Sequence, residues 1–205
     1  MRLKQICGAV LDHGLEIYGA FHPDTDDMSG AGTLILLGPT SNFWDVFTSS
    51  EIYKDDQPDP IDRWSTQVIT TIADDLGAKP IFPFGGPPYA PFLDWAKASG
   101  RAWSSPVGML VHDLTGLMVS YRGALAFKER LNLPVQAFEK PCDTCDTKPC
   151  LTACPVDALA PNGYDVPKCH AHMSSDAGTD CLTGGCLVRR SCPASVGANR
   201  GAEQS

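Results

Sequence analysis

A helical spacing of apolar side chains marks residues 60–76. The apolar positions recur every three to four residues, at Ile61, Trp64, Val68, Ile69, Ile72 and Leu76. This period places them on one face of an α-helix. Asp59 is suited to the N-cap, Pro60 to the first helical position, and Gly77 to the position after the last turn. The sequence therefore predicts a helix from Pro60 to Leu76 with Asp59 as its cap.

Two short apolar runs predict buried strands. Residues 33–37 consist of Thr33 and four apolar residues that end at the Gly38-Pro39 pair, and residues 79–84 precede a loop of Gly and Pro at 85–88. Continuous apolar runs that are bounded by such residues are typical of strands inside a sheet.

Further elements are expected on both sides of these. Helices are expected at residues 41–50 and 88–98, each with aromatic side chains on one side. Residues 107–112 and 117–127 are apolar runs separated by a polar tetrapeptide, which predicts an antiparallel hairpin with a four-residue turn. Helices and strands are intermixed along the chain, so the expected fold class is α+β. No G-x-G-x-x-G loop is present, which argues against a Rossmann dinucleotide site.

Composition and charge limit the classes of protein that fit. The 205 residues carry 16 basic and 24 acidic side chains, a net charge of −8, and 43% of the residues are hydrophobic. This is typical of a globular chain with one or two domains. An acidic chain without a cluster of Lys and Arg lacks the charge pattern of a nucleic-acid-binding protein, so no nucleic-acid partner is expected.

The chain shows no pattern of a membrane span or of an export signal. Its longest apolar run, residues 34–37, is far shorter than the ~20 residues of a membrane helix. Residues 1–12 contain a short apolar stretch that no small-residue cleavage site follows. We therefore expect a cytoplasmic protein without a membrane-spanning segment.

The nine cysteines are unevenly distributed. Eight of them lie between Cys142 and Cys192, and only Cys7 lies outside this region. In a reducing compartment so dense a group indicates metal ligation rather than disulfides. Cys7, which stands among apolar residues, is interpreted as a small core side chain.

The same distribution divides the chain into two domains. Pro134 and Pro141 interrupt regular structure just before the first cysteine of the group. We predict an N-terminal domain at residues 1–138 and a metal-binding domain at residues 139–205. The small and polar residues from 194 onward are expected to form a frayed, disordered tail.

The spacing of the first cysteines is close to that of bacterial ferredoxins. Cys142-x2-Cys145-x4-Cys150-x3-Cys154-Pro155 differs by two residues in one spacer from the C-x2-C-x2-C-x3-C-P run that holds [4Fe–4S] clusters. In two-cluster ferredoxins the fourth cysteine of such a run ligates the other cluster. A second set that ends in Cys-Pro follows, at Cys169, Cys181, Cys186 and Cys192.

These spacings predict two [4Fe–4S] clusters with exchanged ligands. One set of ligands is Cys142, Cys145, Cys150 and Cys192, and the other is Cys154, Cys169, Cys181 and Cys186. Two alternatives remain open. One is a single cluster, and the other is a structural zinc site built from four thiolates, or from thiolates with His170 or His172.

Three segments of the N-terminal part resemble the cobalamin-processing decyanase and dealkylase family. They are FPFGGPPYAPFLDW at residues 82–95, SPVGMLVH at 105–112 and GLMVSYRG at 116–123. The resemblance implies a nitroreductase-like α+β fold with a corrinoid beside residues 84–95. It also implies that Arg122 contacts the thiol co-substrate at the corrinoid, and it makes His112 a candidate for the lower axial ligand of cobalt. The residues expected at this cofactor are Phe84, Gly85, Gly86, Tyr89, Phe92, Trp95, His112 and Arg122.

Simpler roles for the same residues remain open. Phe84, Phe92 and Trp95 would also fill a protein core, and His112 would also serve as a hydrogen-bonded residue at the end of a strand. Arg122, in the middle of an apolar strand, needs a partner if it is buried, and Asp113 or another carboxylate would also serve.

The predicted order of domains is similar to that of the epoxyqueuosine reductases and the reductive dehalogenases, in which clusters deliver electrons to a bound cobalamin. This similarity implies an iron–sulfur redox protein that passes single electrons to a corrinoid. Two alternatives differ in the acceptor. One is a plain ferredoxin-type electron carrier that docks on a partner enzyme, and the other is a flavin-dependent reductase on the same fold. A redox partner protein is expected in each case.

Overall fold

The structure is a computed structural model that describes residues 2–24, 26–161, 163–198, 200, 201 and 204. The chain folds into two compact units. Unit 1 comprises Met1–Gly100 and Ser120–Ala137, and unit 2 comprises Arg101–Val119 and Phe138–Ser205. Both units combine helices with small antiparallel sheets, which confirms the α+β class at this level.

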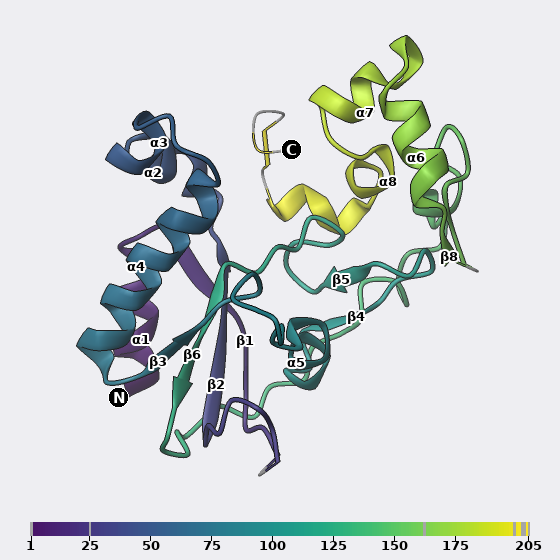
Figure 1. The fold of residues 1–205 in the computed structure, drawn as a ribbon. Coiled ribbons are helices and arrows are strands. Elements are labelled where there is room, and N and C mark those ends of the chain that lie inside the picture. Colours follow the sequence, from purple (N-terminus) through teal and green to yellow (C-terminus); the bar gives the residue numbers. More distant parts are fainter. Residues whose placement is uncertain (1, 25, 162, 199, 202–203, 205) are drawn as a thin grey trace. The chain divides into compact units, whose positions relative to one another are not determined.

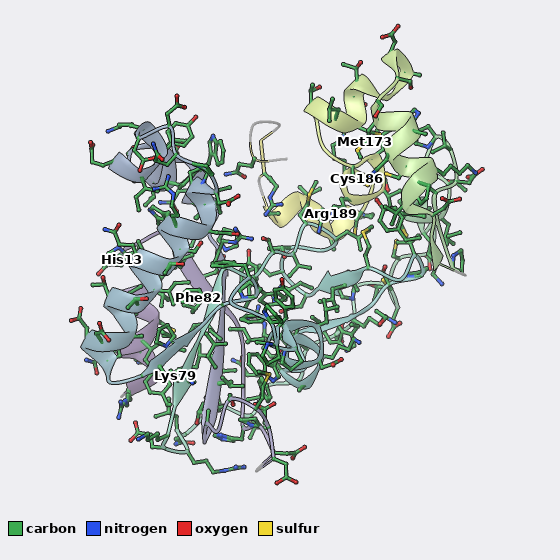
Figure 2. The ribbon with its side chains drawn as sticks, in the orientation of Figure 1. His13, Lys79, Phe82, Met173, Cys186 and Arg189 are labelled. Atoms are coloured by element: carbon green, nitrogen blue, oxygen red, sulfur yellow. The ribbon has the colours of Figure 1, made fainter. Side chains whose placement is uncertain are left out.

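Unit 1 is built on a four-stranded antiparallel sheet with the strand order β1-β2-β6-β3. Its strands are β1 (Leu15–Phe21), β2 (Thr33–Pro39), β6 (Gly123–Phe127) and β3 (Lys79–Ile81). The strand predicted from residue 33 is therefore present as β2, and the one predicted from residue 79 is present but ends early. Figure 2 labels Lys79, where β3 begins, and Phe82, which follows its end.

Two helices cover one face of this sheet, α1 (Arg2–Leu11) and α4 (Pro60–Leu76) (Figure 1). Ile6 of α1 and Ile69 of α4 belong to the same buried cluster as Ile35 and Leu125 of the central strands. The sheet and helices therefore share one hydrophobic core, because each contributes an apolar face to it.

Helix α4 has the bounds that its apolar spacing predicts. Pro60 is its first residue, and Gly77 ends it in the left-handed conformation at a φ of 67°. The predicted cap is wrong in one respect, because the Asp59 side chain makes no capping hydrogen bond. Asp59 itself has a φ of 53°, and its carbonyl accepts a hydrogen bond from the Arg63 amide.

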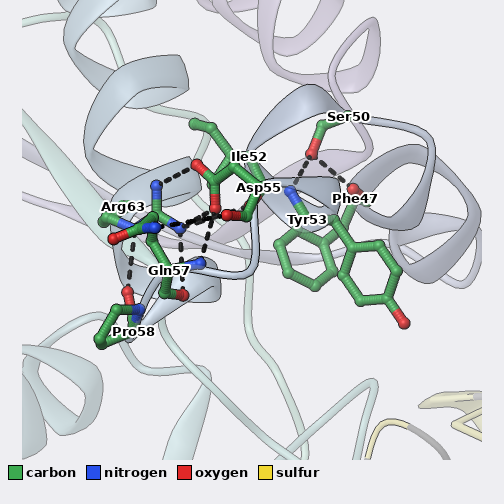
Figure 3. A network of polar contacts seen from close by, with 8 residues as sticks. All are labelled: Phe47, Ser50, Ile52, Tyr53, Asp55, Gln57, Pro58 and Arg63. Carbon is green, nitrogen blue, oxygen red and sulfur yellow. Dashed lines mark hydrogen bonds and ion pairs between the residues drawn. The ribbon is translucent and has the colours of Figure 1, made fainter.

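Three shorter helices complete unit 1: α2 (Phe43–Thr48), α3 (Glu51–Lys54) and α5 (Phe92–Ala98). The connection from α3 to α4 is held by the Arg63 side chain (Figure 3). Its Nη1 and Nη2 donate to the two carboxylate oxygens of Asp55 at 2.7 Å, and its Nε donates to the Pro58 carbonyl at 2.9 Å. Hydrogen bonds from Arg63 lower the pKa of Asp55.

The predicted hairpin of residues 107–112 and 117–127 is wrong. β5 (Leu110–His112) pairs with β4 (Ala102–Ser104) in unit 2, whereas β6 pairs with β2 and β3 in unit 1. The physical reason is that β2 and β6 pair over five residue positions and bury both strands, which a short local hairpin cannot match.

Unit 2 consists of short elements around an apolar cluster. Besides β4 and β5 it contains β7 (Leu159–Ala160), β8 (Gly163–Tyr164), α6 (Val166–Met173), α7 (Thr179–Thr183), α8 (Leu187–Arg190), and the 3₁₀ turns η1 (Pro149–Leu151), η2 (Asp176–Gly178) and η3 (Pro193–Ala198). Val107, Val111 and Leu117 pack in this cluster with Cys150 and Val188.

Unit 2 includes one segment that the sequence predicted to belong to the N-terminal domain. Arg101–Val119 packs with the cysteine-rich part, because its apolar side chains belong to the cluster of unit 2. The start of the predicted frayed tail forms η3, where the buried Ser195 accepts a hydrogen bond from the Leu117 amide at 3.0 Å. Residues 199, 202, 203 and 205 of that tail lie outside the described residues.

The helices in the described part of the chain are not suited to cross a membrane. None of these helices combines the length and the apolar character that crossing a bilayer requires. This agrees with the expectation of a chain without a membrane-spanning segment.

Candidate metal centre

A cavity of about 460 Å³ lies in unit 2, and its wall contains four cysteines. They are Cys142, Cys145, Cys150 and Cys192, the set that the spacing predicts for one cluster. The wall also contains residues from one other stretch of the sequence, among them Ser105, Val111 and Leu117. The structure therefore brings together four thiols that lie as far as 50 residues apart in the chain.

Local turns place these cysteines on the cavity. Lys148 adopts a left-handed conformation, and Pro149 then begins the 3₁₀ turn that carries the buried Cys150. Cys192 follows α8, and its carbonyl accepts a hydrogen bond from the Ser195 amide at 2.9 Å. Because Ser195 is anchored to Leu117, the returning chain holds Cys192 beside the first cysteine loop.

The thiols of this set act on one another electrostatically. Burial raises the pKa of Cys150, and negative charge on Cys142, Cys192 and Cys145 raises it further. Burial also raises the pKa of Cys142, with smaller increases from Cys192 and Cys145. Four thiolates in so apolar a place repel one another, so a cationic group between them is what would hold them ionised.

Three cysteines of the second predicted set act electrostatically on Tyr164 of β8. A hydrogen bond to Cys169, burial, and negative charge on Cys169, Cys186 and Cys154 raise the pKa of Tyr164 to about 12. Cys186 lies just before α8 and is labelled in Figure 2. The fourth predicted member, Cys181, lies on α7, which packs against the helix that carries Cys169, and it is not among the groups that act on Tyr164.

Cys154 differs from Cys142 and Cys150 of the first set in the direction of its pKa shift. Burial alone would raise the pKa of its thiol, but hydrogen bonds from the amides of Val156, Leu159 and Ala158 together lower it. The Ala158 amide lies 3.1 Å from the Cys154 sulfur. Backbone donors of this kind stabilise a thiolate, which is the form that binds metals.

A single zinc ion requires its thiolate ligands to lie close to one another. Thiolates on one zinc, at about 2.3 Å from the metal, lie about 3.8 Å from one another. Within the described residues no group of three or more His, Cys, Asp or Glu side chains is arranged to hold a metal ion. The histidines of the zinc alternative lie on α6, where His170 is exposed and the buried His172 Nε2 has no hydrogen-bond partner among the described residues.

A multi-iron cluster requires a different arrangement of its ligands. Each cysteine binds its own iron atom, so the thiolates surround the whole cluster rather than a single ion. Four thiols on the wall of one cavity, with apolar side chains beside them, fit that requirement. The donor set is also the one that iron–sulfur clusters use.

Most aromatic residues of the segment predicted to lie beside a corrinoid pack against protein. Phe92 and Trp95 are buried with their rings 5.2 Å apart, and Trp95 Nε1 donates to an Asp27 carboxylate oxygen at 2.8 Å. Phe84 stacks on Phe82 at 5.3 Å. Tyr89 is 64% exposed.

The glycines of that segment allow a tight turn of the main chain. Gly86 has no room for a side chain, because a Cβ there would lie 2.6 Å from the Tyr89 nitrogen. Gly85 is exposed, with the Phe82 carbonyl as its nearest neighbour. Both positions therefore shape the loop before α5.

Arg122 is placed immediately before β6 and not inside a strand. Its amide donates to the Leu37 carbonyl at 2.8 Å, and its Nη2 donates to Ser120 Oγ at 2.9 Å. Its Nη1 lies 3.8 Å from a carboxylate oxygen of Asp62, while its buried Nε has no hydrogen-bond partner in the part of the chain that the structure describes. Burial lowers the pKa of Arg122, an effect that the charge of Asp62 opposes. The guanidinium is therefore incompletely satisfied by the groups around it.

The remaining candidates of the corrinoid prediction lie in unit 2. His112 is fully buried on β5, where its Nδ1 accepts a hydrogen bond from the Leu114 amide at 3.2 Å. Asp113, suggested as a partner for Arg122, instead pairs with Arg101 at 3.0 Å. His112 and Arg122 thus belong to different compact units.

Sequence reasoning missed the part of the cavity wall that comes from residues 105–117. The apolar alternation of this segment predicts a strand, but it carries no signal of the unit in which the strand is buried. No protein-family model, curated protein or solved structure matches the chain. Its function must therefore be argued from the arrangement of its own side chains.

Proposed function

We propose that this chain is an iron–sulfur electron-transfer protein whose unit 2 holds two [4Fe–4S] clusters in a ferredoxin-like module. The observation that carries the proposal is the cavity on which Cys142, Cys145, Cys150 and Cys192 meet. The ferredoxin-like spacing selects the same set of four cysteines.

Two observations support an exchange in which each cysteine run supplies its last cysteine to the cluster of the other run. Cys192 closes the second run but lines the cavity of the first set. Cys154 closes the first run but acts on Tyr164 together with Cys169 and Cys186. The second cluster is accordingly assigned to Cys154, Cys169, Cys181 and Cys186.

A [4Fe–4S] cluster supplies reversible transfer of one electron. The protein supplies the thiolate ligands, the backbone donors to Cys154, and the apolar cover of Val107, Val111 and Leu117. Each electron must come from a one-electron donor and leave to an acceptor of higher potential. We propose a redox partner protein in the cytoplasm as the donor.

The proposed acceptor is a corrinoid held by unit 1 in a nitroreductase-like domain. The support comes from the resemblance of residues 82–95 and from the unpartnered Nε of Arg122, which is suited to a carboxylate, phosphate or amide oxygen of a ligand. Burial of Phe92 and Trp95 in the protein core favours the second candidate, a plain electron carrier that passes electrons to a partner enzyme. Flavin bound to unit 1 remains a third candidate for the acceptor.

The first test is the cofactor content of the whole chain. We expect protein that is purified without oxygen, or reconstituted with iron and sulfide, to hold about eight irons and eight sulfides per chain. Reduction should produce the electron paramagnetic resonance (EPR) signals of two interacting [4Fe–4S] clusters. Protein that binds zinc and no iron under these conditions would overturn the proposal.

A further inference from the structure

Cys154 differs from the other cysteines in the main-chain amides that donate to its sulfur. The Ala158 amide lies 3.1 Å from Cys154 Sγ, and the amides of Val156 and Leu159 also donate hydrogen bonds to it. These contacts are direct and come from the chain that follows Cys154. The sulfur therefore has donors in place that can stabilise negative charge on it.

A tight turn of the main chain produces this arrangement. The Asp157 amide donates to the Cys154 carbonyl at 3.2 Å, and Asp157 adopts the left-handed conformation at a φ of 50°. The chain after the turn is anchored, because Ala158 is buried and its carbonyl accepts from the Asp165 amide at 2.8 Å. The amides are thus held at the sulfur by the fold and need no rearrangement when its charge changes.

Cys142 and Cys150 of the first set lack a comparable group of donors. Within the described residues Cys142 has no amide donor to its sulfur, and Cys150 has its own amide alone, which is the weakest of the effects on its pKa. The wall around them is mainly apolar and includes Val111 and Leu117, and Cys150 is only 7% exposed. Apolar surroundings stabilise added negative charge less than main-chain donors do.

We propose that the main-chain amides around Cys154 raise the reduction potential of the second cluster above that of the first, so that the second cluster accepts the first electron. The first cluster is the one assigned to Cys142, Cys145, Cys150 and Cys192. This inference rests on the proposed function, since it requires both clusters. Reduction adds one electron from an external one-electron donor and breaks no bond. The added charge resides partly on the ligand sulfurs, so donors at a sulfur stabilise the reduced form more than the oxidised form.

One charge close to Cys154 acts against the amides. Asp157 carries negative charge in the same turn, and its effect on the pKa of Cys154 is the weakest of those that act on this thiol. Asp157 is exposed, so water and salt screen its charge. The pKa of Cys154 is lowered overall, and the amides therefore outweigh both burial and this charge.

The first test measures which cluster is reduced first. Cys142→Ala removes a ligand of the first cluster and Cys169→Ala a ligand of the second, so each variant reports the potential of the cluster that it retains. Both variants and the wild type are assayed for iron and sulfide and titrated with dithionite, and EPR gives the midpoint potentials. We expect the more positive midpoint in Cys142→Ala. At that potential about nine-tenths of the first cluster should remain oxidised, because two ordinary hydrogen bonds shift the ratio by more than about tenfold.

The second test removes one donor without changing a side chain. Replacement of Ala158 by lactic acid turns its amide N–H into an ester oxygen and keeps the methyl group. The ratio of reduced to oxidised second cluster at the wild-type midpoint should then fall about fivefold, which corresponds to one hydrogen bond. The potential of the first cluster should not change. The same replacement at Ala98, an exposed residue of α5 in unit 1, is the matched control and should leave both potentials unchanged.

The corresponding ester at Val156 repeats the test at a second donor and decides it if the Ala158 ester loses iron. Equal potentials, or a more positive potential in Cys169→Ala, would overturn the inference. So would unchanged potentials in the two esters with full iron, or an equal shift in the Ala98 control. Loss of the second cluster in both esters would also overturn it, since the amides would then serve assembly rather than the potential. Wild-type protein without iron would instead overturn the proposed function itself.

Discussion

Cys142 and Cys192 lie on the wall of one cavity although 50 residues separate them in the sequence. Each stands at one end of the cysteine-rich region, and each raises the pKa of Cys150 through its charge. The chain between them carries Cys154, Cys169 and Cys186, which all act electrostatically on Tyr164. The two predicted sets are thus interleaved in the sequence.

Removal of one ligand should remove one cluster. We expect Cys142→Ala to lose about half of the iron and sulfide of the reconstituted protein, because a [4Fe–4S] cluster requires four protein ligands. Chemical iron and sulfide analysis measures this loss. Cys7→Ala is the matched control, since Cys7 lies on α1 in unit 1 and should leave the iron content unchanged. Unchanged iron in Cys142→Ala would refute the ligand assignment.

The interleaved assignment makes a sharper prediction. Cys192→Ala should lose the same EPR signal as Cys142→Ala, and Cys154→Ala should lose the same signal as Cys169→Ala. The reason is that Cys192 lines the cavity of the first set, whereas Cys154 acts on Tyr164 together with Cys169 and Cys186. Ligation by consecutive cysteines would give the opposite pairing, with Cys154→Ala matching Cys142→Ala.

Arg122 provides the test for a ligand in unit 1. Titration of the anaerobic protein with cobalamin should give saturable binding at one corrinoid per chain, with a change to the base-off absorption spectrum. Arg122→Ala should weaken this binding at least tenfold, because a charge-assisted hydrogen bond to a ligand would be lost. Arg130→Ala, which changes an exposed arginine of the same unit, should bind as the wild type does.

The same titration separates the candidate functions. A wild-type protein that binds no corrinoid at micromolar concentration, but holds its clusters, would be a plain electron carrier. Release of a yellow flavin on denaturation would instead identify a flavin-dependent reductase. Equal corrinoid binding by wild type and Arg122→Ala would remove the arginine from the site.

The pair of Asp55 and Arg63 should make stability depend on pH. The pKa of Asp55 is lowered by hydrogen bonds from Arg63, so the folded state holds this proton less tightly than the unfolded state does. The stabilisation is therefore present above the ordinary pKa of 3.8 and is lost as the pH falls through the lowered value. Asp55→Asn should lower the midpoint of urea unfolding at neutral pH. This difference from the wild type should disappear as the pH falls below 3.8.

A control for this effect is available nearby. Glu51 pairs with Lys54 on the surface of α3 at 3.0 Å, and its side chain is 93% exposed. Glu51→Gln should change the midpoint of urea unfolding much less than Asp55→Asn does, because exposed pairs contribute little. If Asp55→Asn destabilises the protein equally at neutral pH and below pH 3.8, the ion pair does not contribute to stability.

Elements that depend on local chemistry were predictable from the sequence. The helix from Pro60 to Leu76 has both predicted ends, since its apolar period, its first proline and its terminal glycine act within one segment. The strand that begins at Thr33 was predictable for the same reason. The spacing of the cysteines also predicted the set of four that lines one cavity.

Other features were decided only by tertiary structure. The apolar residues between 107 and 127 divide between two units, because β6 finds its partners in β2 and β3, and β5 finds its partner in β4. Burial of Phe92 and Trp95, and the unpartnered Nε of Arg122, depend in the same way on side chains remote in sequence.

The sequence by itself determined which residues could form helices and strands and which cysteines could act as ligands, since spacing and residue type are local properties. Only the tertiary structure decided which strands pair, and that residues between 105 and 117 line the cavity of the four cysteines. Such outcomes depend on competition between distant segments for burial and hydrogen bonds, and a pattern within one segment contains no information about its competitors.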